Sequence, residues 1–479
     1  MIGRKARRHG HGTAQSRAES PDPQAEECPG SEPFRARGCT RVVTRTPALA
    51  LIAILVTACG GGPSSPATGA PTGGPTAAAT SSADSASARI AGWTGDLEAI
   101  VPGLERHHPD PYHSVAKEIL VEAIDDLEAS IPTATDDELM AGVLRVVAMV
   151  SSAGRDAHTG AYVWGSGTYP THTLPLRLWV FPEGVAVVDA LPPYEALVGR
   201  VIASLDGHPI ADVLEALEPL TPRDNPATVT LLAPRFLLTT EILHGAGLID
   251  DPGAVELSFD DDPATAIDVA AIPTADYNDW ATPYGLHLPT RPDVPWLARS
   301  EEPIWTRLDA DGTLFIQYNR VTRLAGPDLD ALRTAIAEPA VRRTIVDIRH
   351  NFGGETFGYP PVADALVERA SAWSGGLFLI TGRNTFSAAS LFAADLTARA
   401  DVTVVGEPMG GSPALYGNAD DVALSWSGLV VSVATELFEP VPGDDRLELP
   451  VDLAAPISLA DFLAGRDPAM AAIADAPTD

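Results

Sequence analysis

Cysteine and lysine are both scarce in this chain of 479 residues. The cysteines are Cys28, Cys39 and Cys59, and the lysines are Lys5 and Lys117. The chain beyond Cys59 therefore has no disulfide, no cysteine–zinc site and no cysteine nucleophile. It also offers Lys117 as its single lysine, which restricts the catalytic bases available to it.

Basic residues and long apolar runs are scarce as well. Arg and Lys together number 32 against 64 Asp and Glu, a formal net charge of -32. A chain of this charge repels phosphate, which excludes nucleic-acid binding and attachment to a membrane surface through basic residues. Hydrophobic residues make up 45% of the chain, enough to bury a core. No His-Glu-x-x-His, P-loop or dinucleotide-binding motif occurs, so we expect no metal and no cofactor.

The N-terminal part reads as a targeting segment. The apolar run 48–56 is preceded by Arg41 and Arg45 and is too short for a spanning helix, which needs about 20 residues. It ends in Val-Thr-Ala-Cys at Cys59, which resembles the lipobox of bacterial lipoproteins. We therefore expect residues 1–58 to be an N-terminal extension and signal peptide, and Cys59 to carry a lipid that anchors the protein outside the cell membrane. The alternative is an ordinary cleavage site with a chance cysteine.

Two further features of this region follow from composition. Residues 1–40 are polar and rich in arginine, so either the signal peptide is unusually long or translation begins downstream, at Val42 or Val43. Residues 59–88 are Gly, Pro, Ser, Thr and Ala with almost no charge. Such a stretch cannot bury a core, so we expect a flexible tether.

The rest of the chain divides into three regions with different patterns. Residues 89–152 show apolar positions three or four apart and predict a helical domain. Within 174–275, a strand, an Asp-Gly turn and a helix occur in the order found in a PDZ domain. From 300 to 479 strands and helices alternate, which indicates an α/β domain with parallel strands covered on both faces. Segment 153–173 lies between the first two regions.

Two segments of the α/β region could carry chemistry. A buried strand at 344–348 leads into Gly353 and Gly354, where backbone N–H groups can approach a reacting carbonyl. A second strand leads into Thr385-Phe386-Ser387 at the start of a helix, where exposed N–H groups favour a developing oxyanion. Alone, the first segment could be a plain tight turn, and Thr385 or Ser387 could merely cap the helix.

Together, these segments resemble the serine peptidases of the carboxyl-terminal processing (tail-specific) and tricorn-core type. The resemblance spans about 93–479 and implies a ClpP/crotonase-like α/β core, a helical N-terminal part and a PDZ-like insert. It places the nucleophile on Ser387 and the oxyanion hole on the backbone of Gly353 or Gly354 and of Ala388. No cofactor is implied, and the partner is a peptide or protein substrate.

The same resemblance identifies the candidate base. Processing proteases use a lysine at the position that is Ser412 here, so a Ser–Lys dyad is not expected. Tricorn-type relatives use a histidine from the N-terminal part, in an Asp-x-His-Thr motif that matches Asp156 to Thr159 and assigns His158 as the base. The family's serine before the histidine is replaced by Ala157. The acid that orients His158 is then Glu448, with Asp445 as another candidate.

Other histidines give weaker signals. His350 neighbours the glycine turn and is a candidate substrate contact, although a supporting role is the simpler interpretation. His107, His108 and His113 lie near the first helix, where solvated or packing side chains are the simpler interpretation. Ser114 and Lys117 match a Ser-x-x-Lys motif by chance, because no lysine follows to complete the set.

The sequence therefore predicts an extracytoplasmic, lipid-anchored serine endopeptidase with a Ser–His acyl-enzyme mechanism. The first alternative is a catalytically inactive ligand- or peptide-binding lipoprotein on the same fold. The second is hydrolysis of a non-peptide ester or amide by the same residues. Substrate specificity and oligomeric state are not determined by the sequence.

Overall fold

The computed structural model describes residues 82–164, 167–281 and 285–476. The predicted signal peptide, Cys59 and most of the predicted tether lie outside these residues. The first helix, α1 (Ser82–His107), begins inside the range 59–88 that the sequence assigned to the tether. None of the described helices has the length and apolar content needed to cross a membrane.

Three helices open the described chain, as the periodicity over 89–152 predicts. They are α1, α2 (Lys117–Ser130) and α3 (Asp136–Ala148). Thr135 begins α3 with a capping box, in which its hydroxyl accepts from the Glu138 N–H and the Glu138 carboxylate accepts from the Thr135 N–H. Three acidic residues in the first turn of α3 favour the positive end of its dipole.

These helices do not bury a core of their own. Trp93 of α1 and Val143 of α3 belong to the same hydrophobic cluster as Phe236, Phe259 and Val433, which come from later parts of the chain. The helices are therefore packed on the middle region and on a hairpin of the C-terminal region.

The middle region combines short strands with helices. Its strands are β2 (His172–Thr173), β3 (Leu176–Phe181), β4 (Gly184–Ala190), β5 (Ile202–Leu205), β6 (His208–Pro209), β7 (Ala254–Phe259), β8 (Asp262–Ala270) and β9 (Ile272–Pro273). Its helices are α4 (Ile210–Leu217), α5 (Pro226–Leu238), α6 (Thr240–Gly245) and α7 (Thr274–Trp280). The predicted strand, Asp206-Gly207 turn and helix are present as β5, the turn to β6, and α4. Strands β6, β5, β7 and β8 form a four-stranded sheet in that order.

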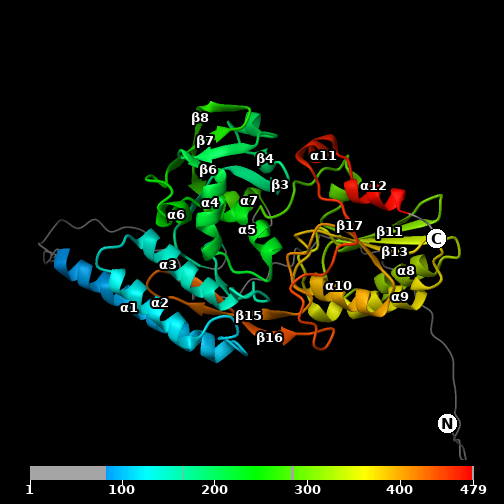
Figure 1. The fold of residues 1–479 in the computed structure, drawn as a ribbon, viewed down its shortest axis with the longest axis horizontal. Helices are drawn as coiled ribbons and strands as arrows, with labels where there is room; N and C mark the ends of the chain where they lie inside the picture. Colours follow the sequence, from blue (N-terminus) through cyan, green and yellow to red (C-terminus); the bar gives the residue numbers. More distant parts are fainter. Residues whose placement is uncertain (1–81, 165–166, 282–284, 477–479) are drawn as a thin grey trace, which may run out of the picture. The chain divides into compact units, whose positions relative to one another are not determined.

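The C-terminal region contains a six-stranded sheet (Figure 1). Its strands, in sheet order, are β10 (Ile304–Leu308), β11 (Thr313–Tyr318), β12 (Arg343–Asp347), β13 (Leu377–Thr381), β14 (Thr403–Gly406) and β17 (Leu453–Ala454). Strands β11, β12, β13, β14 and β17 pair in parallel with their neighbours in the sheet, and β10 pairs antiparallel with β11. Its helices are α8 (Gly326–Ala337), α9 (Pro360–Ala370), α10 (Ala388–Arg399), α11 (Leu459–Ala464) and α12 (Pro468–Asp475).

Both faces of this sheet are covered, as its continuously apolar strands predict. Val346 of β12 packs in a cluster with residues of α8, α9 and α10 on one face. Its neighbour Ile345 points to the opposite face, where it packs in a cluster with Ile473 of α12. Because successive side chains of a strand point to opposite faces, a strand buried on both must be apolar throughout.

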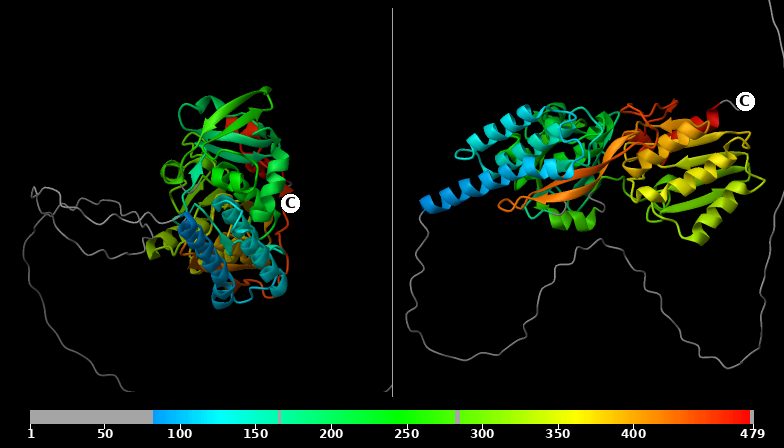
Figure 2. Two further views of the ribbon diagram at one scale, coloured as in Figure 1. Left: turned by 90° about the vertical axis from the view of Figure 1, so that its left-hand side faces the viewer. Right: turned by 90° about the horizontal axis from the view of Figure 1, so that it is seen from below.

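A long hairpin connects the sheet region to the helices. Strands β15 (Leu415–Ala423) and β16 (Val430–Phe438) follow β14 and pair antiparallel with each other. They reach α1, as Figure 2 shows, where Asp96 accepts hydrogen bonds from the N–H groups of Trp426 and Ser427 at the hairpin tip. Strand β1 (Gly160–Ala161) adds to the hairpin by pairing with β16. This pairing fixes the segment that carries His158.

A buried arginine joins the end of β12 to α12. The Arg349 guanidinium bonds to Asp347 and, through both Nη atoms, to the Asp467 carboxylate at 2.9 Å. Asp467 also caps α12 by accepting from the N–H groups of Ala469 and Met470. Asp347 is fully buried, so its carboxylate depends on Arg349 for compensation.

We expect Arg349→Met to lower the free energy of unfolding by about 3 to 5 kcal/mol, because it leaves the Asp347 carboxylate buried without its cation. Urea denaturation followed by circular dichroism measures this. Arg333→Met, on the exposed face of α8, is the matched control and should change stability by less than about 0.5 kcal/mol. Equal stability of the two variants would contradict the role of the ion pair.

Candidate active site

Ser387 has a backbone conformation that is unusual for a residue with a side chain. Its φ is 51° and its ψ is -129°, immediately before α10. This conformation is disfavoured for residues other than glycine and costs on the order of 1 to 3 kcal/mol. It occurs at a sharp turn between β13 and α10, which presents the hydroxyl at the start of the helix.

Neither hydroxyl of this segment caps the helix. Ser387 occupies the capping position of α10, but its side chain makes no capping hydrogen bond. Thr385 is buried, donates to the Ile348 carbonyl at 2.9 Å and accepts from the Gly382 N–H at 3.2 Å. Helix capping therefore does not explain the Thr385-Phe386-Ser387 segment.

The Ser387 hydroxyl lies instead against His158. The distance from Ser387 Oγ to His158 Nε2 is 3.1 Å, although the residues are 229 positions apart in the chain. The ring of Phe386 stacks on the imidazole, with centroids 4.9 Å apart and planes at 15°. His158 is half-buried and is one of the residues that line the adjacent cavity.

The loop carrying His158 is held on both sides by hydrogen bonds. On the hairpin side, the Arg155 carbonyl accepts from the Tyr416 N–H at 2.7 Å, and the Thr159 hydroxyl accepts from the Ala434 N–H. On the other side, the Ala157 N–H donates to the Asp224 carboxylate at 2.7 Å. The position of His158 therefore depends on the β15–β16 hairpin and on the start of α5.

The two candidate glycines differ in their surroundings. Gly353 has φ 97°, and a Cβ at this position would lie 2.7 Å from the Ser387 Cβ, so a side chain is excluded beside the serine. Its N–H donates to Asn351 Oδ1 at 3.0 Å. Gly354 forms a parallel β-bridge with Val321. In this bridge the Val321 N–H donates to the Gly353 carbonyl, and the Val321 carbonyl accepts from the Glu355 N–H. In such a bridge the N–H of Gly354 itself points away from Val321.

Ala388 provides a further N–H group at the serine. It is the first residue of α10, and the N–H groups of Ala389 and Ser390 already donate to Phe386 and Ser387. The first N–H groups of a helix lack partners within the helix and face the positive end of its dipole. The Ala388 N–H is therefore a donor available next to the Ser387 hydroxyl.

The predicted acid lies elsewhere. Glu448 and Asp445 are exposed, and neither makes a hydrogen bond or ion pair with His158 among the described residues. The structure thus does not bring Glu448 to the site. The short segment between the hairpin and β17 keeps both side chains in solvent, a placement that sequence order alone could not reveal.

The structure also accounts for the lysine position of the processing proteases. Ser412 is buried and donates from its hydroxyl to the carbonyls of Asp224 and Leu447. Lys117 is exposed and pairs with Glu105 at 2.5 Å. Among the described residues, therefore, no lysine reaches the Ser387 hydroxyl.

A buried histidine–aspartate cluster, which the sequence interpretation missed, lies beside the His158 loop. Asp156 accepts from His108 Nε2 at 3.0 Å and from the Thr159 N–H, and His113 Nε2 lies 3.5 Å from the same carboxylate. The Tyr416 ring contacts both histidine rings, with centroids 4.7 and 4.6 Å away. The motif contained Asp156, but nothing in the spacing linked it to histidines on the α1–α2 loop.

The three side chains have ligand atoms close enough for a metal ion, but their hydrogen bonding favours another interpretation. Their candidate ligand atoms lie within 4.8 Å of one another. However, His108 Nδ1 accepts from the Asp110 N–H at 2.9 Å, so the proton of the neutral ring is on Nε2 and is donated to Asp156. A metal-bound histidine normally donates from its other nitrogen. The cluster is therefore a hydrogen-bonded support for Asp156.

The pKa of His158 reflects opposing effects. Burial of the ring lowers it below its usual value, while the Asp156 carboxylate and the Tyr416 backbone act to raise it. His158 Nδ1 is buried and has no partner in hydrogen-bonding geometry, although the Tyr416 backbone lies near enough to affect the pKa. The net direction favours neutral imidazole, the form that accepts a proton.

Asp224 is a second buried carboxyl that sequence inspection missed. It accepts from the Ala157 and Ser412 N–H groups at 2.7 and 3.2 Å and has no ion pair among the described residues. Burial raises its pKa to about 7 despite these two hydrogen bonds. It stands just before the cap of α5 and connects that helix to the His158 loop.

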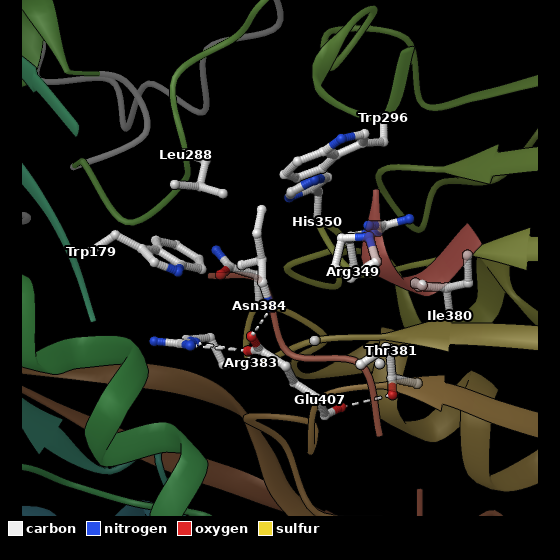
Figure 3. Close-up of a pocket in the computed structure, with 16 residues that line it drawn as sticks. Trp179, Leu288, Trp296, Arg349, His350, Ile380, Thr381, Arg383, Asn384 and Glu407 are labelled. Atoms are coloured by element: carbon white, nitrogen blue, oxygen red, sulfur yellow. Dashed lines mark hydrogen bonds and ion pairs between the residues drawn. The ribbon is translucent and has the colours of Figure 1, made fainter. Parts of the chain in front are cut away.

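His350 does not reach Ser387 but forms part of the wall behind it. Its ring stacks on Trp296, with centroids 5.6 Å apart and planes at 9° (Figure 3). The adjacent small cavity also contains the Arg383–Glu407 ion pair and has a volume of about 30 Å³. This is room for one or two waters and excludes a substrate side chain.

Two larger cavities are lined by residues that contact the serine. One, of about 270 Å³, is lined by His158, Phe386 and apolar residues including Trp164 and Leu231. The other, of about 440 Å³, adjoins Gly353 and Gly354. Leu286 and Phe352 line both cavities, which are therefore neighbours in one cleft.

We expect the pKa of His158 to lie below 6.5, because burial outweighs the nearby carboxylate. NMR titration of the histidine ring carbons measures it, with His158→Gln assigning the resonance. Asp156→Asn should lower this pKa further by removing the negative charge, whereas Asp445→Asn, an exposed change of equal charge, should leave it unchanged. A pKa above 6.5 in the wild type would contradict the burial argument.

The fold of this chain is also found in solved structures of other proteins. No family model and no curated protein matches the chain. A mutant of CPAF has a TM-score of 0.54 at 13% identity, covering 79% of this chain and 95% of that one. Mature CPAF complexed with lactacystin gives 0.51 at 12% identity, covering 78% and 96%. These matches show a shared fold.

Proteases named in the predicted resemblance are also among the structural neighbours. The photosystem II D1 C-terminal processing protease has a TM-score of 0.35 at 16% identity, covering 77% of this chain and 93% of that one. The tricorn protease has 0.37 at 14% identity, covering 81% and 36%. The fold is shown by the CPAF matches, and the chain has the fold of CPAF.

Proposed function

We propose that this protein is a serine endopeptidase that acts through Ser387 and His158. The contact of 3.1 Å between Ser387 Oγ and His158 Nε2, made by a serine in a strained backbone conformation, carries this proposal. A hydroxyl held against a neutral imidazole is activated when the imidazole takes its proton. The fold shared with CPAF agrees with the proposal but does not by itself establish an activity.

The reaction proceeds in two halves. Ser387 Oγ attacks the peptide carbonyl carbon while its proton passes to His158 Nε2. His158 then gives that proton to the leaving amine nitrogen as the peptide C–N bond breaks, which leaves an acyl ester on Ser387. Water then attacks the ester while its proton passes to His158, and His158 gives that proton to Ser387 Oγ as the ester C–O bond breaks, which releases the acid and the free serine.

Backbone N–H groups stabilise the oxyanion formed in each half. The Ala388 N–H at the start of α10 is one donor, supported by the helix dipole. Because the Gly353 N–H is already bonded to Asn351, we assign the second donor to Gly354. Gly353 contributes by having no side chain, because a Cβ there would clash with Ser387.

The imidazole is oriented without Glu448. For Nε2 to accept the serine proton, the neutral ring must carry its own proton on Nδ1. This nitrogen faces the Tyr416 backbone. Asp156 supplies negative charge that stabilises the imidazolium without a direct hydrogen bond. His108 and His113 hold that carboxylate in place and pack on Tyr416.

Active-site labelling with a fluorophosphonate probe tests the mechanism. We expect the full-length wild type to be labelled, Ser387→Ala to be unlabelled, and His158→Ala to react at least 100-fold more slowly, because the base is lost. Labelling is measured by in-gel fluorescence and by mass spectrometry of the modified peptide.

Ser390→Ala is the matched control, because Ser390 is buried one turn along α10 and its hydroxyl donates to the Thr385 carbonyl. It should be labelled like the wild type. A folded wild type that does not react would favour the alternative, a binding protein that keeps the fold without catalysis. Cleavage of esters but of no peptide would favour hydrolysis of a non-peptide substrate.

We further propose that the enzyme is a lipoprotein held outside the cell membrane by Cys59, with a PDZ-like insert over 174–275 that holds a peptide near the cleft. The Val-Thr-Ala-Cys sequence before three glycines supports the anchor. The order of β5, the Asp-Gly turn and α4 supports the insert.

Intact-mass analysis of membrane-extracted protein tests the anchor. We expect a chain that begins at Cys59 and carries added acyl mass, and we expect Cys59→Ala to leave the protein unprocessed or soluble. Recovery of a soluble product with unmodified Cys59 would contradict the proposal. Cys39→Ala is the control and should not change the product.

A further inference from the structure

The cavity beside Gly353 and Gly354 is lined by charged residues, unlike the cavity beside His158. Its volume is about 440 Å³, enough for a substrate side chain or chain end. Leu288, Trp296 and Leu297 give it apolar walls, and Arg177 and Arg320 also line it. The cavity beside His158 has mainly apolar walls and no arginine lining it.

Arg177 provides a buried cation at this cavity. Its residue surface is 8% exposed, and burial lowers the pKa of its guanidinium from the usual value. One Nη atom donates to the His287 carbonyl, and the other lies 3.9 Å from Asp189, beyond hydrogen-bonding distance. Its Nε is buried without a hydrogen-bond partner among the described residues. A guanidinium that lines a cavity and is compensated only by a carboxylate 3.9 Å away favours an anionic ligand.

Arg320 adds a second positive charge at the rim. It is exposed, and its side chain makes no hydrogen bond or ion pair with the residues that the structure describes. Glu301 on the rim is the opposing charge and is also exposed.

The two histidines that line the cavity add no charge near neutral pH. Burial and the nearby Arg177 lower the pKa of His287 to about 4. Burial, Arg349 and His287 keep the pKa of His350 well below its usual value. The positive charges at the cavity are therefore Arg177, which Asp189 compensates only at 3.9 Å, and Arg320, which lies on the same rim as Glu301.

We propose that this cavity binds a carboxylate of the peptide substrate, with Arg177 as its buried partner and Arg320 at the entrance. The carboxylate belongs either to an Asp or Glu side chain or to the C-terminus of the peptide. The inference rests on the proposed peptidase function, because the cavity shares Gly353 and Gly354 with the site of Ser387. A peptide bound across the serine then places a carboxylate on one side and an apolar side chain in the neighbouring cavity.

Binding to the Ser387→Ala variant tests this without turnover. The probes are octapeptides of alanine and leucine with Glu or Gln at each position in turn, each made with a free C-terminal carboxylate or a carboxamide. Calorimetry measures each dissociation constant. We expect one Glu/Gln pair, or the carboxylate/carboxamide pair, to differ by about 10-fold or more, as charge-assisted hydrogen bonds predict.

Arginine variants in the same background locate the carboxylate. Arg177→Gln should abolish the preference, Arg177→Lys should retain part of it, and Arg320→Gln should reduce it without a risk to folding. Arg333→Gln, an exposed arginine of α8 that lines neither cavity, is the matched control and should retain the full preference. Circular dichroism checks that each variant is folded.

The outcomes separate this inference from the proposed function. Peptides that bind without any carboxylate preference, a preference that survives both Arg177→Gln and Arg320→Gln, or a peptide set that does not bind would overturn the inference. Labelling of Ser387 together with equal binding of each pair would reject the cavity assignment alone. A carboxylate preference in a protein whose Ser387 is unreactive would instead reject the peptidase and retain the cavity.

Discussion

The pairing of the His158 loop with the β15–β16 hairpin is the constraint on which the site depends. Ser387 is positioned locally, by the turn between β13 and α10, whereas His158 comes from 229 residues earlier. It reaches the serine because β1 joins β16 and because Tyr416 bonds to the Arg155 carbonyl. The hairpin is in turn held at its tip by Asp96 of α1. The N-terminal helices thus support the geometry of a site that they do not line.

Two buried carboxyl groups flank the same loop, and they serve it differently. Asp156 is bonded to His108, which lowers the pKa of that carboxyl and keeps a negative charge near His158. Asp224 lacks a cationic partner among the described residues, and its pKa is raised to about 7, so its role is to receive the Ala157 and Ser412 N–H groups. Apolar contacts alone could not fix the loop this way, because backbone N–H groups buried without acceptors are costly.

Much of the catalytic region could be predicted from the sequence. The alternation of strands and helices indicated the α/β sheet, since only strands buried on both faces are continuously apolar. The glycine turn and Ser387 were recognised because both occur at strand ends with specific residue types. Glu448 was assigned by order along the chain and is exposed, and His108 and His113 were interpreted as solvated or packing side chains. The packing of both histidines is confirmed, whereas their contact with Asp156 and the exposure of Glu448 depend on parts of the chain distant in sequence, for which spacing carries no signal.

The sequence by itself determined which residues are candidates for the chemistry. It has no lysine at position 412, and its resemblance to the processing and tricorn-type peptidases pointed to Ser387 with His158 as the base. Only the tertiary structure decided which groups surround His158 and which residues line the cleft. The Asp156 cluster, Asp224 and the Arg177 cavity are each assembled from separate parts of the chain. Burial gives these charges their effect, because a charge removed from water must find its partner in the fold.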